Sequence, residues 1–108
     1  MTFETVRKAV DTIKRSSLDE LRDDFLQRCI DYARLRAQWT LLSKEARLEM
    51  DRHRTLTHNA LISSRNALVR NMRAVSEDVA WSDNLNDDRR LIGDFACYVA
   101  CHLALAGA

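Results

Sequence analysis

Proline is absent from this chain of 108 residues, and glycine occurs only at Gly93 and Gly107. Average usage would give roughly five prolines and about seven glycines in a chain of this length. Turns between strands depend on these two residue types, so their scarcity argues against a sheet. Alanine, leucine, arginine and acidic residues are abundant instead, and of these only aspartate is a poor helix former. We therefore predict an all-α protein, a compact bundle of four to five helices forming one domain over residues 1–108.

A strong net charge is also missing, because the formal charge is only +1. This gives no global attraction to nucleic acid or to an anionic membrane. The charges are nevertheless unevenly placed: residues 52–76 contain five arginines and no acid, whereas residues 77–94 contain six acids and two arginines. We interpret this as internal neutralisation, with a basic helix packed beside the acidic stretch.

The three cysteines, Cys29, Cys97 and Cys101, are an odd and scattered set, which does not indicate a disulfide framework. The first residues are charged and lack the apolar core of a signal peptide. Together these features predict a cytoplasmic protein with reduced thiols. The apolar tail of residues 95–108 is too short to span a bilayer, so we expect a core helix there and no membrane contact.

Apolar spacing predicts helices over residues 2–14, 17–42, 44–75 and 89–105. Ser17 and Glu20 have the spacing of a capping box for the second helix, and Ser43 can cap the third. Without a glycine or proline near residue 43, the second and third helices could also be continuous. Sparse apolar residues between positions 50 and 60 indicate a possible kink or break in the third helix.

Residues 76–88 have a loop composition, and we expect Trp81 to pin this loop to the core. Either Asp87 or Asp88 should cap the last helix. Gly93 lies near the start of that helix, where a close approach of another helix would explain the presence of glycine.

A polar seam runs along the predicted third helix, where polar residues recur at spacings of three, four and seven and so share one face. Its members are Arg52, Asn59, Ser63, Asn66, Arg70 and Arg73. The seam is either a solvated face that meets water or an acidic neighbour, or a groove that binds an anionic ligand or a partner, because guanidinium groups suit carboxylate and phosphate. We expect Asp94 to pair with one of these arginines, since an unpaired carboxylate on a buried helix is costly.

Spacing does not indicate a metal centre. His53, His58 and His102 are the candidates for ligation or acid–base chemistry, but no HExxH, ExxH or CxxC motif occurs. We therefore expect no metal and no cofactor. The basic stretch also lacks aromatic residues for base stacking and a helix-turn-helix pattern, so nucleic-acid binding is possible but not favoured.

Arg52 and His58, with His53 between them, match the Arg, four to six residues, His pattern, which resembles the helical ribonuclease domains of toxin and abortive-infection systems. That resemblance covers seven residues and implies Arg52 and His58 as a metal-independent catalytic pair acting on RNA phosphate. Six positions along an unbroken helix place two side chains about 240° apart. A ribonuclease therefore requires the helix to begin or kink between them.

The stretches Arg54-Thr-Leu-Thr-His58-Asn59-Ala60-Leu61-Ile62, Asn66-Ala-Leu68-Val-Arg70 and Asp88-Arg89-Arg90-Leu-Ile92-Gly93-Asp94-Phe95-Ala96 resemble small, uncharacterised bacterial helical proteins. The resemblance spans about the last half of the chain and implies a bacterial, cytoplasmic, helical domain without a known activity. We expect a binding or interaction protein rather than an enzyme. It should form a homodimer through the broad apolar face of the second helix and use the polar seam to contact a partner or a small anionic ligand.

Overall fold

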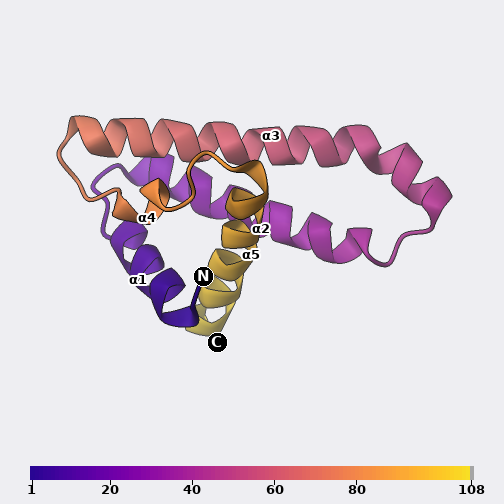
Figure 1. Cartoon of the computed structure of the whole chain (residues 1–108), viewed down its shortest axis with the longest axis horizontal. Helices are drawn as coiled ribbons and strands as arrows, with labels where there is room; N and C mark the ends of the chain where they lie inside the picture. The colour runs from indigo at the N-terminus through magenta and orange to yellow at the C-terminus, as the bar shows by residue number, and fades with distance from the viewer. Residues whose placement is uncertain (108) are drawn as a thin grey trace.

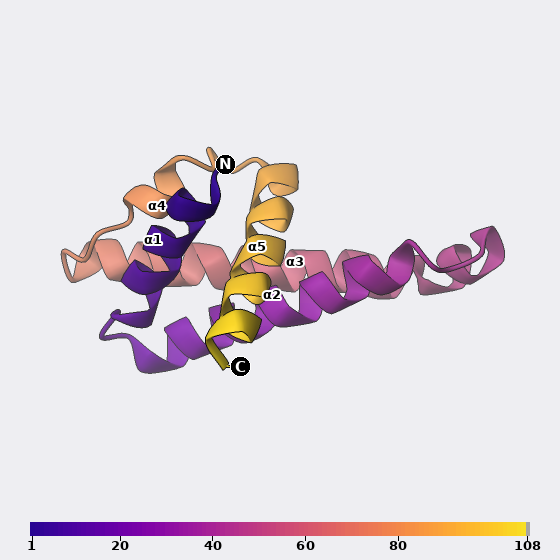
Figure 2. The same cartoon turned by 90° about the horizontal axis from the view of Figure 1, so that it is seen from below.

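The computed structural model describes residues 1–107 and contains five helices within them: α1 (Phe3–Lys14), α2 (Asp19–Trp39), α3 (Lys44–Ala74), α4 (Ala80–Asp83) and α5 (Arg89–Gly107). No strand occurs in this part of the chain, so the all-α prediction is confirmed. The helices α2 and α3 form a long antiparallel hairpin, and α1 and α5 lie across one side of it (Figures 1 and 2). The hairpin extends well past α5 at the α2–α3 turn.

The core lies where α1 and α5 cross the hairpin. Its fully buried side chains come from every long helix and include Val6, Ile13, Phe25, Leu61, Leu68, Met72, Ile92 and Val99. Trp81 of α4 is buried between two of the core aromatics, with ring centroids 5.8 Å from Phe25 and 5.7 Å from Phe95. The loop is therefore pinned to the core by Trp81, as predicted. Phe3, which shares the apolar spacing of α1, is instead 61% exposed.

The boundary between α2 and α3 lies at Ser43. Ser43 caps α3, because its side chain accepts a hydrogen bond from the Ala46 N–H at 3.1 Å. The helices α2 and α3 are therefore separate. Of the kink or break expected between positions 50 and 60, the break does not occur, since α3 is one helix of 31 residues. Asp88, rather than Asp87, caps α5 by accepting from the N–H groups of Arg90 and Leu91 at 2.9 and 3.1 Å.

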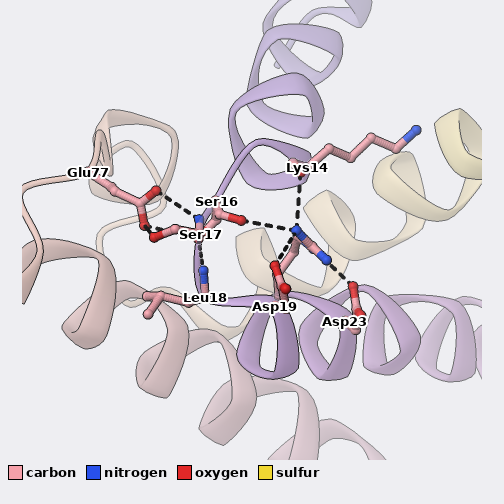
Figure 3. Close-up of polar contacts among 8 residues, drawn as sticks. Lys14, Ser16, Ser17, Leu18, Asp19, Asp23 and Glu77 are labelled. Carbon is pink, nitrogen blue, oxygen red and sulfur yellow. Dashed lines mark hydrogen bonds and ion pairs between the residues drawn. The ribbon is translucent and has the colours of Figure 1, made fainter.

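The capping box predicted for α2 does not form. The helix begins at Asp19 after Leu18, which makes no side-chain cap, and Ser17 bonds elsewhere. Figure 3 shows the Glu77 carboxylate against the α1–α2 turn. It accepts hydrogen bonds from the Ser16 hydroxyl at 3.1 Å, the Ser17 N–H at 3.0 Å and the Ser17 hydroxyl at 3.3 Å. A glutamate 60 residues away thus takes the place of Glu20.

Glu77 is aimed at this turn by the way α3 ends. Ser76 adopts a left-handed conformation with φ of 60°. The Ser76 N–H then donates to the Arg73 carbonyl at 3.0 Å, and the Glu77 N–H donates to the Met72 carbonyl at 2.9 Å. These two bonds form a Schellman motif, in which glycine usually occupies the left-handed position.

The last helix packs on α2 and α1 through a face of small and apolar residues. Ile92, Phe95, Ala96 and Val99 are buried on this face, which makes α5 part of the core as predicted. A Cβ added at Gly93 would lie 2.7 Å from the Tyr32 hydroxyl, so the close approach expected at this glycine exists. The helix is 19 residues long, and by length and composition alone it could cross a membrane, with 28% of that apolar window buried. The length of the apolar segment therefore does not exclude a span.

Candidate functional site

A polar cleft lies between the C-terminal half of α3, the segment 82–87 and the start of α5. Its volume is about 540 Å³, which is within the usual range for small-molecule sites. We call it the α3 cleft and define it by its lining residues: Ile62, Arg65, Asn66, Val69, Arg70, Arg73, Ser82, Asp83, Asn86, Asp87 and Ile92.

Arg65 forms the base of the cleft and is only 6% exposed. It occupies the buried face of α3, four residues after Leu61 and three before Leu68. Its guanidinium donates to the Asn66 side-chain oxygen at 2.8 Å, to the Ser82 carbonyl at 3.1 Å and to the Asp87 carboxylate. These three acceptors offset the cost of burying the charge. No described residue accepts from Arg65 Nε.

Arg70 differs from the other two arginines of the cleft. Arg73 pairs with Asp83, and Arg65 pairs with Asp87, so segment 82–87 is tied to α3 at two points. Arg70 is exposed and makes no hydrogen bond or ion pair with any residue among positions 1–107. It therefore offers a free guanidinium at the mouth of the cleft.

Asn66 lies one helical turn before Arg70 and adds a second donor on the same side of α3. Its oxygen is already engaged by Arg65 at 2.8 Å, which leaves the side-chain amide nitrogen free to donate. The combination of a free guanidinium and a free amide N–H pair presents donors only. Such a set is suited to an anion.

The opposite wall of the cleft is a strained loop. Asn86 and Asp87 both have left-handed backbones, with φ of 49° and 56°. Non-glycine residues in this region cost about 1–3 kcal/mol each, and they cluster at functional sites. Ser82, at the cleft end of α4, is fully buried, and its hydroxyl has no hydrogen-bond partner among the described residues.

The polar seam predicted from the sequence is divided by the fold. Its last three members, Asn66, Arg70 and Arg73, line the α3 cleft. Asn59 instead accepts a hydrogen bond from Arg89 at 2.6 Å and so helps to hold the start of α5. Arg52 and Ser63 are exposed and lie outside the cleft.

Asp94 does pair with an arginine, but the predicted partner is wrong. Its carboxylate lies 2.7 Å from Arg36 of α2, not from an arginine of α3. The Asp94 hydrogen bond raises the pKa of the Arg36 guanidinium. The pair joins α5 to α2 away from the α3 cleft. The expected contact between basic helix and acidic stretch is made by Arg65 and Arg73 instead.

Arg52 and His58 are not brought together. Because α3 continues through both positions, their side chains are separated by a rotation of about 240° around the helix axis and lie on different faces. His58 packs its ring on Tyr32 at 5.1 Å, and its Nε2 lies 3.2 Å from the Arg89 carbonyl oxygen. Burial lowers the pKa of His58 below its usual value of 6.5. These contacts give His58 a packing role between α2, α3 and α5.

The remaining histidine, cysteine and acidic side chains of the described residues do not form a metal centre. Among residues 1–107, no group of three His, Cys, Asp or Glu side chains is close enough to hold a metal ion. Cys29 is buried, and this burial raises the pKa of its thiol far above the ordinary value of 9.0.

No protein family, curated protein or solved structure matches this chain. The α3 cleft is therefore the candidate binding site.

Proposed function

We propose that this chain is a small helical binding protein that holds an anionic ligand in the α3 cleft. One observation carries the proposal: Arg70 is a free guanidinium beside the donor amide of Asn66, while the neighbouring arginines are tied down by aspartates. A fixed fork of N–H donors is suited to a carboxylate or a phosphate.

The chemistry of the cleft favours binding over catalysis. Its ionisable side chains are three arginines and two aspartates, and both aspartates are in ion pairs. Arginine stays protonated at ordinary pH, and each aspartate carboxylate is already engaged by an arginine. The cleft thus provides positive charge and hydrogen-bond donors rather than a group poised to transfer a proton.

Calorimetric titration of the full chain with two five-carbon carboxylates, valerate and glutarate, tests the proposal. We expect saturable binding that Arg70→Gln weakens by about tenfold, the effect of losing one charge-assisted contact. Arg52→Gln is the matched control, because Arg52 lies on the same helix but outside the cleft. Binding of neither carboxylate, or equal weakening by both variants, would show that the cleft is not the site.

We further propose that the protein acts as a homodimer through the far part of the α2–α3 hairpin. No residue from position 36 to position 57 is buried. Three leucines there are largely in solvent: Leu41 is 87% exposed, Leu48 72% and Leu56 55%. A two-helix arm lacks a core of its own, and a second copy could complete a four-helix arrangement. The three free cysteines suit a reducing compartment such as a bacterial cytoplasm.

Sedimentation velocity at micromolar concentration tests the dimer. We expect a dimeric species that Leu48→Glu shifts toward monomer. Leu105→Glu is the control, because Leu105 is similarly exposed at 66% but lies at the end of α5. A wild-type chain that sediments only as monomer would remove this part of the proposal.

A further inference from the structure

The net charge of the residues that line the α3 cleft indicates the charge of the ligand that it binds. Arg65, Arg70 and Arg73 line the cleft together with Asp83 and Asp87. Three cations against two anions leave one net positive charge. The free cation is Arg70, because the other two arginines are paired with the aspartates.

We infer that the α3 cleft selects a small organic anion that carries one negative charge, a monocarboxylate with an apolar body. This inference rests on the proposed function, and it specifies which anions the site accepts. One carboxylate neutralises Arg70 and leaves both ion pairs intact. A second carboxylate in the same volume would face Asp83 and Asp87, and like charges repel more strongly in a partly enclosed site than in bulk water.

The apolar part of the ligand follows from the other lining residues. Ile62 and Val69 line the cleft from α3, and Ile92 lines it from α5. Val69 and Ile92 are almost fully buried, so the partly exposed Ile62 side chain offers the main surface for methylene or methyl groups beside the donors of Arg70 and Asn66. A short hydrocarbon chain on this surface is removed from water, which favours its binding. A bare inorganic anion would leave this surface unused.

Two further observations indicate a built site rather than an accidental row of surface arginines. Arg65 and Ser82 are both more than nine-tenths buried, and Arg65 Nε and the Ser82 hydroxyl have no partner among the described residues. The left-handed residues Asn86 and Asp87 also hold the facing wall in a costly conformation. Buried polar groups without a partner and left-handed backbone positions therefore occur among the lining residues of the same cleft.

A matched set of five-carbon ligands tests the inference by calorimetry on the full chain. Valerate has one carboxylate, glutarate has two, and valeramide has none. We expect valerate to bind about tenfold more tightly than either of the other two, because glutarate meets the aspartates and valeramide lacks the charge that Arg70 recognises.

A change in the charge of the cleft provides the decisive comparison. Asp83→Asn raises its net charge by one unit with little change of shape, and it should reverse the preference so that glutarate binds more tightly than valerate. Asp78→Asn is the matched control, because it makes the same charge change in the neighbouring segment outside the cleft and keeps an oxygen for the Ala80 N–H. This control should leave the preference for valerate unchanged.

The outcomes separate this inference from the proposed function. If glutarate binds wild-type protein more tightly than valerate, and Arg70→Gln weakens that binding, the single-charge inference is wrong while anion binding in the cleft stands. A preference for valerate that Asp83→Asn leaves unchanged also overturns the inference. If neither carboxylate binds, the proposed function fails and the inference fails with it.

Discussion

The contact between Glu77 and the α1–α2 turn leads to a prediction in which structure and sequence pattern disagree. The sequence assigns the capping of α2 to Glu20, whereas the structure uses Glu77, which follows the end of α3. Replacing each glutamate by alanine in turn therefore tests which of them stabilises the protein. We expect Glu77→Ala to be destabilising and Glu20→Ala to be nearly neutral.

The magnitude follows from the hydrogen bonds that Glu77 accepts. Ser16 donates at 3.1 Å and is 3% exposed, so its hydroxyl loses an acceptor where water cannot easily replace it. Ser17 donates twice to the same carboxylate but is exposed, so water recovers part of that loss. Bonds to a charged group contribute about 1.5–3 kcal/mol each when they are protected from solvent. With this discount for exposure, Glu77→Ala should cost about 2 kcal/mol.

Thermal unfolding followed by circular dichroism measures the difference. For a domain of this size, about 2 kcal/mol corresponds to a loss of roughly 10 °C in Tm. Glu20→Ala removes one acidic side chain from the first turn of α2 and should cost no more than about 0.5 kcal/mol. Equal losses for the two variants, or a Glu77→Ala protein with wild-type Tm, would refute the reasoning.

Three further predictions concern single residues. Ser76→Gly should raise the free energy of unfolding by about 1 kcal/mol, because glycine adopts the left-handed φ of 60° without strain; urea denaturation measures this. Burial holds the pKa of His58 below 6.5, so the unfolded chain takes up the proton first as pH falls. Stability should therefore decrease below pH 6.5, and the Tm of His58→Gln should depend less on pH there. Gly93→Ala should destabilise by about 1 kcal/mol, since the added Cβ would lie 2.7 Å from the Tyr32 hydroxyl. In a Tyr32→Ala background the same change should stabilise, because alanine is the better helix former.

The fold was largely predictable because it depends on local patterns. Helix positions follow from the spacing of apolar residues, and the caps at Ser43 and Asp88 follow from side chains a few residues away. The predicted capping box failed for a different reason. Its serine is used by a residue 60 positions later, and a local pattern contains no information about such a partner.

The candidate site was predicted only in part. Periodicity placed Asn66, Arg70 and Arg73 on one helix, and the structure brings these three into the cleft. Arg65 is not part of the predicted seam, because the seam follows a polar face of the helix whereas Arg65 lies on the buried face between Leu61 and Leu68. An arginine at an apolar position of a helical repeat is a signal that could have identified it. The wall formed by segment 82–87 could not be predicted, because its position depends on tertiary contacts.

The row of arginines on α3 shows how one residue type takes different roles through burial. Arg65 is almost fully buried, so its bond to the Ser82 carbonyl is protected from solvent, whereas its ion-pair partner Asp87 is 86% exposed and open to screening by salt. Arg73 and Asp83 are both more than half exposed, so their ion pair contributes little and is screened. The segment facing the cleft is thus firmly attached at the Arg65 end and loosely attached at the Arg73 end. A ligand that binds Arg70 lies between these two points, so the buried Arg65 attachment keeps the site in place and neither ion pair has to break.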